Sequence, residues 1–123
     1  MEHNGKLTVD EQLEMQRTLQ EQYHKIWSPM VPEQGAHQLL WGIIEAGEAA
    51  DVIKKMGDQA IMNDPETRRH FIEEIADVVM YLNDVFLCYG IIAISLALYS
   101  LKKNREEKLK QEAEMRVVLS EQK

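Results

Sequence analysis

Apolar and polar positions alternate along this chain with the period of an α-helix. A first helix opens at "TVDE", where Thr8 and Glu11 form a capping box, and apolar residues then recur at helical spacing as far as Trp27. The segment "SPMVPEQG" (28–35) holds two prolines and a glycine, which end the helix. The pattern therefore predicts a helix followed by a turn over the first 35 residues.

Two longer helices follow. One is predicted from about residue 36 to 56, with Gly57 at its C-terminal end and the loop "GDQAIMN" after it. The next is predicted over about 65–89, because Asp64 can cap it and Pro65 suits its first turn. These two segments are long enough to pack against each other along most of their length.

A fourth helix is predicted from near Ile91. It opens with the apolar run "GIIAISLALYSL" (90–101) and is highly charged beyond it. Four helices with short links favour an all-α four-helix bundle, with residues 1–123 as a single domain. Its core would span about 8–101, and 102–123 would be a charged helical extension. The apolar start of the fourth helix is expected either at the centre of the bundle or in a subunit interface.

Composition limits the function classes. The chain has 123 residues, 45% apolar content and a net charge of −7, so it suits one acidic globular domain and not a nucleic-acid-binding protein. Its single cysteine, Cys88, excludes a disulfide framework within the chain, and a reducing, cytoplasmic setting is expected. The longest apolar run is too short to span a bilayer, so no membrane association is expected.

Four acidic residues stand out because they share helix faces with apolar residues. Glu45 and Glu48 lie between Trp41 and Val52, opposite a face that carries Leu40, Ile43, Ile44, Gly47 and Ala50. That helix therefore has two buried faces, or one buried face and one that lines a pocket.

On the next long helix, Glu74 and Asp77 share a face with Phe71, Tyr81 and Cys88. A buried, unpaired carboxylate costs several kcal/mol or more. A basic partner, protonation or a divalent cation could compensate. Few basic residues lie on these faces, and protonation suits one or two acids better than four, so Mg²⁺ is favoured.

The carboxylate pattern resembles the MazG-like, all-α nucleoside triphosphate pyrophosphohydrolases. Their E-x-x-E, spacer, E-x-x-D pattern reads here as Glu45, Glu48, Glu74 and Asp77, and "LLWGIIEAGEAADVIKK", "FIEEIADVVMYLNDV" and "EMQRTLQEQY" are similar to the flanking text over residues 8–90. The apolar "IIAISLALYSL" departs from the polar start of the family's fourth helix. The resemblance implies an oligomer, either a homodimer or a homotetramer, that uses Mg²⁺, with Mn²⁺ as a substitute. It would cleave a nucleoside triphosphate between the α and β phosphates, in house-cleaning or on dUTP or dCTP.

Under this hypothesis all four acids hold the metal, and Glu45 or Glu48 activates the water. Asp84 is either a further metal or outer-shell ligand or a structural acid. Lys55, Lys102, Lys103 and Arg105 are candidate phosphate contacts, although each is also expected as a solvated cation. A base could stack on Trp41 or Trp27, with its edge read by Gln16 or Asn83, although core packing also suits the aromatic residues. The alternative is a non-catalytic oligomeric helical bundle, or a sensor that binds nucleotide or metal without turnover.

Overall fold

The computed structural model describes residues 5–122, and these residues form helices and connecting segments with no β-strand. The all-α prediction is therefore confirmed for this part of the chain. The elements, in order, are α1 (Val9–Gln22), the short 3-10 helix η1 (Pro32–Gln34), α2 (Gly35–Met56), α3 (Asp58–Asn63), α4 (Pro65–Cys88) and α5 (Ser95–Glu121).

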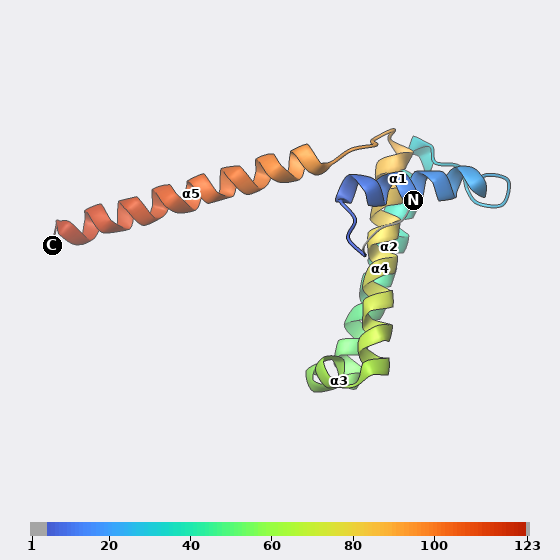
Figure 1. Ribbon diagram of the computed structural model, residues 1–123, viewed down its shortest axis with the longest axis horizontal. Helices are drawn as coiled ribbons and strands as arrows, with labels where there is room; N and C mark the ends of the chain where they lie inside the picture. The colour runs from blue at the N-terminus through green and yellow to red at the C-terminus, as the bar shows by residue number, and fades with distance from the viewer. Residues whose placement is uncertain (1–4, 123) are drawn as a thin grey trace.

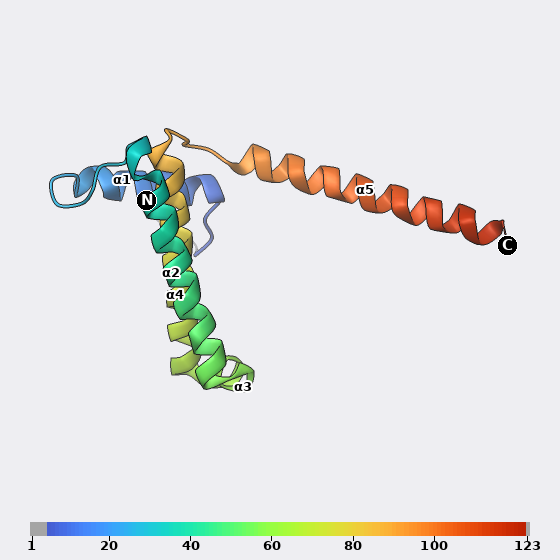
Figure 2. The ribbon, with the colours of Figure 1, turned by 180° about the vertical axis from the view of Figure 1, so that it is seen from behind.

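Helices α2 and α4 form a long hairpin, which two opposite views show side by side (Figures 1 and 2). Helix α2 ends at Gly57, whose φ of 86° lies in the left-handed region that glycine adopts without strain. Helix α4 begins after Asp64, whose Oδ2 accepts hydrogen bonds from the backbone N–H (3.2 Å) and the hydroxyl (2.6 Å) of Thr67. The predicted ends of both helices are confirmed within one or two residues.

The predicted loop "GDQAIMN" is wrong in one respect, because most of it is helical. Residues Asp58–Asn63 form α3 at the tip of the hairpin. The acidic side chain of Asp58 lies in its first turn, where a negative charge favours the positive end of the helix dipole. The short helix shortens the connection and lets α4 return directly along α2.

The contact between α2 and α4 uses the side of α2 that carries the acidic residues. A Cβ atom added at Gly42 would lie 3.3 Å from the Cβ of Tyr81, so the missing side chain lets the two helices approach closely here. Ala49 and Val52 are buried on the same side of α2. Because Glu45 falls between Gly42 and Ala49 at helical spacing, it is carried into the contact between the helices.

Helix α1 lies across the open end of the hairpin, where α2 begins and α4 ends (Figure 1). Its capping box is confirmed: Thr8 Oγ1 accepts from the Glu11 N–H, and Glu11 Oε1 accepts from the Thr8 N–H, each at 3.1 Å. Leu13 is fully buried and Gln16 is 7% exposed. Helix α1 therefore brings one apolar and one amide side chain against the hairpin.

Helix α5 points away from the other helices (Figure 1) and has no buried residue among those described. It begins at Ser95, four residues later than predicted. Asp10 of α1 holds this end: its Oδ1 accepts from the N–H groups of Ile94 (2.8 Å) and Ser95 (3.0 Å), and its Oδ2 accepts from the Ser95 hydroxyl (2.5 Å). The single chain therefore does not place its last long helix in a four-helix bundle.

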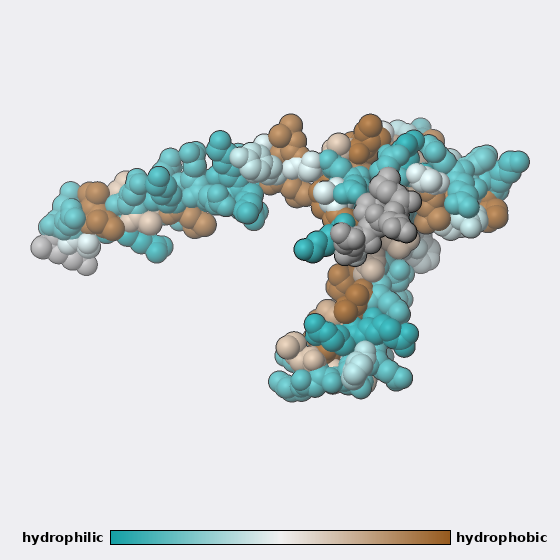
Figure 3. All heavy atoms as spheres, viewed as in Figure 1, coloured by the Kyte–Doolittle hydropathy of each residue, from teal (hydrophilic) through white to brown (hydrophobic). Residues whose placement is uncertain are grey.

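The hairpin leaves much apolar surface uncovered, which appears as brown side chains in Figure 3. The accessible surface is 9915 Å², whereas a compact monomer of 14.3 kDa exposes about 6,800 Å². Part of the excess belongs to α5, and part lies on the faces of α2 and α4 that turn away from their mutual contact. The large exposed apolar side chains on those faces are Leu39, Leu40, Ile43, Ile44, Ile72, Ile75, Val79 and Leu82.

Candidate functional site

Three of the four predicted acids converge between α2 and α4. Carboxylate oxygens of Glu45, Glu48 and Glu74 all lie within 4.8 Å of one another. The two α2 residues are three apart and so share a face, and Glu74 reaches them from α4. Asp77 lies outside this group of three, one turn further along α4, although its charge acts on Glu45. The structure thus brings together three of the four acids predicted from the two separate motifs.

The acids repel one another; Glu45 and Glu74 are partly withdrawn from water, whereas Glu48 is exposed. The pKa of the Glu45 carboxyl is raised from its ordinary value, first by burial and then by the neighbouring Glu48, with smaller effects from Asp77 and Glu74. The Glu74 side chain is 15% exposed. Its Oε2 is buried and has no hydrogen-bond partner among the described residues, and its Oε1 lies 3.7 Å from Nε2 of the exposed His70. A cation could serve as the partner of Oε2.

The three acids fit a hard divalent cation. Mg²⁺ takes oxygen ligands, and the group of three supplies carboxylate oxygens from two helices. No histidine or cysteine belongs to the group, so it lacks the ligands typical of structural zinc sites. The buried Oε2 of Glu74 gives the site an acceptor with no hydrogen-bond partner in the described part of the chain. The three glutamates could therefore hold a metal ion, and its identity as Mg²⁺ stays a prediction.

A cavity of about 540 Å³ adjoins the acids and runs toward α1. Its walls come from α1, the segment after it, α2 and α4. Two of the predicted acids, Glu45 and Asp77, line it, and so does Trp41. The other lining residues are Gln16, Gln20, Ile26, Trp27, Ser28, Met30, His37, Gln38, Met80, Tyr81 and Asp84.

Aromatic side chains form part of the cavity wall. The Trp41 indole N–H donates to His37 Nε2 at 2.6 Å, so this histidine nitrogen is unprotonated and the two rings meet edge to face. Trp27 stacks on Tyr23 with ring centroids 5.0 Å apart. The pKa of Tyr81 is raised, first by burial and then by Glu45, Asp77 and Asp84. Aromatic walls of this kind can hold the flat ring of a base.

Asp84 binds two glutamine amides from α1. Its Oδ1 accepts from Nε2 of Gln16 at 2.8 Å and from Nε2 of Gln20 at 3.1 Å. Asp84 is 5% exposed, and burial raises the pKa of its carboxyl against the opposing effect of the two amides. All three residues line the cavity. Asp84 was predicted as a metal-associated or structural acid, and here it fixes a polar network.

Gln20, His37 and Tyr81 are cavity residues that the sequence reasoning did not select. The sequence did contain a signal for Gln20, because Gln16 and Gln20 lie on the same helix face as the buried Leu13. Two amides on an apolar stripe indicate a polar partner across the interface. That partner, Asp84, is 68 residues from Gln16 along the chain, so only the packing identifies it.

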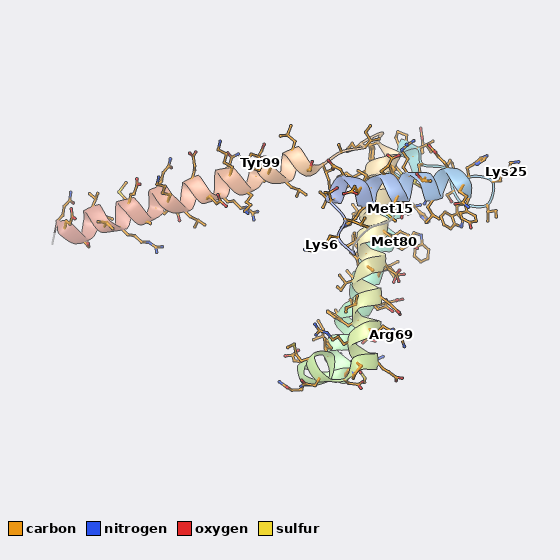
Figure 4. The ribbon with its side chains drawn as sticks, viewed as in Figure 1. Lys6, Met15, Lys25, Arg69, Met80 and Tyr99 are labelled. Atoms are coloured by element: carbon orange, nitrogen blue, oxygen red, sulfur yellow. The ribbon has the colours of Figure 1, made fainter. Side chains whose placement is uncertain are left out.

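The structure does not bring the predicted phosphate contacts to the cavity. Lys55 is exposed in the last turn of α2 and pairs with Asp51 at 2.8 Å. Lys102, Lys103 and Arg105 lie on the outward-pointing α5. No lysine or arginine lines the cavity within residues 5–122. Figure 4 shows Arg69 toward the hairpin tip, well along α4 from the cavity residue Met80.

No protein-family model, no curated protein and no solved structure matches this chain. The MazG-like resemblance therefore rests on the acidic motifs and their flanking residues and stays a prediction. Within the described residues, no helix has both the length and the apolar content needed to cross a membrane.

Proposed function

We propose that the chain is a Mg²⁺-dependent nucleoside triphosphate pyrophosphohydrolase, which releases a nucleoside monophosphate and pyrophosphate. The observation that carries this proposal is the convergence of Glu45, Glu48 and Glu74, together with the buried Oε2 of Glu74, which has no hydrogen-bond partner within residues 5–122. The adjoining aromatic cavity supplies room for a nucleoside. The resemblance of the two acidic motifs to MazG-like enzymes gives the reaction class.

The acids would bind the phosphates through Mg²⁺, and the cavity would bind the nucleoside. Mg²⁺ held by Glu45, Glu48 and Glu74 would neutralise charge on the phosphate oxygens. Asp77 shares the cavity with Glu45 and adds a fourth acid beside the group. Trp27 and Trp41 face the same space and would hold the base.

Glu45 is the best placed of the acids to activate water. It belongs to the converging group and also lines the cavity, so it lies between the proposed cation site and the space for the nucleotide. Its carboxylate would accept a proton from the water whose oxygen attacks the α phosphorus. The bond from that phosphorus to the bridging oxygen then breaks, and pyrophosphate leaves with the bond electrons.

A second function is supported by one specific observation. No lysine or arginine lines the cavity in the described part of the chain, although a triphosphate carries several negative charges. A non-catalytic, oligomeric helical protein that binds metal or nucleotide needs fewer cations than a hydrolase. Such a protein would bind Mg²⁺ or nucleotide and release no pyrophosphate.

The proposal includes assembly into a homodimer or homotetramer. The uncovered apolar faces of α2 and α4 support it, because isolated soluble domains rarely expose such extended apolar surface. The accessible surface exceeds that of a compact monomer by about 3,100 Å², which is more than a standard interface removes from one partner. A second copy would cover the same faces that it presents.

The oligomer is tested by charge substitution. Ile43→Glu on α2 should convert the oligomer to monomer in sedimentation velocity, because a buried, unpaired carboxylate opposes association. Met62→Glu on α3 is the matched control, since Met62 is 64% exposed and Ile43 is 60% exposed. A monomeric wild-type protein at micromolar concentration would refute the assembly proposal.

The activity is tested by product analysis on a panel of nucleoside triphosphates with Mg²⁺. Pyrophosphate and monophosphate are the expected products. Glu74→Gln should abolish them, whereas Glu73→Gln, which changes the adjacent exposed acid, should not. Orthophosphate as the product would contradict cleavage between the α and β phosphates. Folded, Mg²⁺-binding protein that yields no product would favour the non-catalytic alternative.

A further inference from the structure

We propose that Gln16, Gln20 and Asp84 form a base-reading element that selects nucleotides whose base carries an amino group next to an unprotonated ring nitrogen on its pairing edge, as cytosine and adenine do. This inference rests on the proposed function for the location of the nucleotide, and its test separates the two. Its structural basis is the pair of hydrogen bonds from the two glutamines to one buried carboxylate oxygen.

The carboxylate determines which way each amide faces. A carboxylate accepts hydrogen bonds and donates none, so the amide nitrogen of each glutamine must be the group that faces Asp84. Each glutamine therefore keeps its Oε1 and one remaining N–H for another partner. The described residues provide no hydrogen bond to Oε1 of Gln16 or Gln20. The cavity is where that partner would bind, because both glutamines line it.

An amide that offers an oxygen beside an N–H matches a particular base edge. Cytosine and adenine present an amino donor next to a ring-nitrogen acceptor, and a glutamine side chain pairs with such an edge through both groups. Uracil and hypoxanthine present a carbonyl oxygen next to a ring N–H, which is the reverse order. With the amide held by Asp84, an oxygen would face an oxygen and an N–H would face an N–H, so neither hydrogen bond could form.

Burial makes this orientation difficult to reverse. Gln16 is 7% exposed and Asp84 is 5% exposed, so turning an amide over would leave its oxygen against the carboxylate without solvent to compensate. Asp84 also lies outside the group of three converging acids, and its Oδ1 already accepts two amide donors. Asp84 therefore acts as a positioning residue for the amides.

The base-reading element also lies in the same cavity as two of the acids predicted to bind the metal. Glu45 and Asp77 line the same space as the two glutamines and Asp84, and Tyr81 lines it as well. A nucleotide could therefore place its phosphates toward the acidic group and its base toward α1. Trp41 would then face the base or the sugar between the two ends.

The test uses substrate pairs that differ only at the amino group. For the wild-type protein, kcat/KM from pyrophosphate release should favour dCTP over dUTP and ATP over ITP by about 10- to 100-fold. Asp84→Asn keeps the size of the side chain but also offers a donor, so either amide orientation becomes satisfied and each ratio should fall toward one. Melting temperatures of both proteins establish that the variant is folded.

A second pair of variants separates recognition from structural damage. Gln20→Met removes the amide at similar length and should lower the dCTP to dUTP ratio. Gln22→Met changes an exposed glutamine of α1 that does not line the cavity, and it should leave the ratio unchanged. Equal wild-type activity on the members of each pair, or a preference for dUTP and ITP, would overturn the inference.

A binding measurement distinguishes failure of this inference from failure of the proposed reaction. Quenching of tryptophan fluorescence by CMP and UMP, without Mg²⁺, reports on the cavity because Trp27 and Trp41 line it. Tighter binding of CMP that Asp84→Asn removes, with no turnover of any triphosphate, would support the base-reading element and refute the hydrolase. Equal binding of CMP and UMP would refute the base-reading element.

Discussion

Mg²⁺ should stabilise the folded protein through Glu74, and this prediction depends on the site alone. The three converging acids repel one another, and Glu74 Oε2 is buried without a partner among residues 5–122. A cation that binds this group only in the folded chain must raise the free energy of unfolding. Glu74→Gln removes one ligand charge and should remove most of the effect.

The size of the effect follows from mass action. At a Mg²⁺ concentration ten times the dissociation constant, binding to the folded state alone adds about 1.4 kcal/mol. A chain of 123 residues has an unfolding entropy of about 260 cal/mol/K at its melting temperature. The wild-type protein should therefore melt about 5 °C higher than in EDTA, whereas Glu74→Gln should shift by less than about 1 °C.

The assay is thermal unfolding followed by circular dichroism at a fixed protein concentration, because an oligomer would make the melting temperature depend on concentration. Glu73→Gln is the control, since it removes an equal charge from the adjacent exposed position. In EDTA, Glu74→Gln should melt no lower than the wild type, because it relieves charge repulsion. Equal Mg²⁺ shifts in the wild type and Glu74→Gln would refute the reasoning.

Three further predictions follow from individual residues. Leu13→Ala should lower the free energy of unfolding by about 2–5 kcal/mol in urea titrations, because Leu13 is fully buried. The pKa of Asp10 is lowered from 3.8, first by the hydrogen bond from the Ser95 hydroxyl. The hydrogen bonds from Ser95 to Asp10 should therefore persist above pH 3.8 and be lost as the pH falls through the lower pKa of the folded protein. Amide exchange at Ser95 measures this loss, and Asp10→Asn should abolish its pH dependence. The pKa of Glu45 is raised from 4.5, so calorimetric Mg²⁺ affinity should weaken on acidification at a higher pH than for an ordinary glutamate.

Local sequence signals were sufficient to predict the hairpin. Gly57 and the Asp64 cap define where α2 ends and α4 begins, and both act through residues only a few positions away. Glu45, Glu48 and Glu74 could be predicted as site residues for the same reason, because the helical period of the nearby sequence shows which helix face each of them occupies. Their convergence could be inferred since the two motifs lie on helices that pack together.

Longer-range features were harder to predict. The position of α5 depends on Asp10, which is 85 residues from Ser95, and no periodic pattern indicates that contact. The apolar residues at the start of α5 suggested a place in the bundle, yet Leu96 and Leu98 are exposed in the single chain. The prediction that Lys102, Lys103 and Arg105 contact the phosphates required α5 to pack beside the acids, and in the single chain α5 points away from them.

The apolar environment of the acids has a structural cause. Gly42, Glu45, Ala49 and Val52 form one stripe on α2, and the small residues in it let α4 approach. Glu45, the acid in that stripe, is only partly exposed, and its charge is repelled by Glu48, Asp77 and Glu74. With Glu45, Glu48 and Glu74 so placed, the hairpin contact and the proposed cation site are parts of one interface, and a substitution that widens the hairpin at Gly42 should weaken Mg²⁺ binding as well as folding.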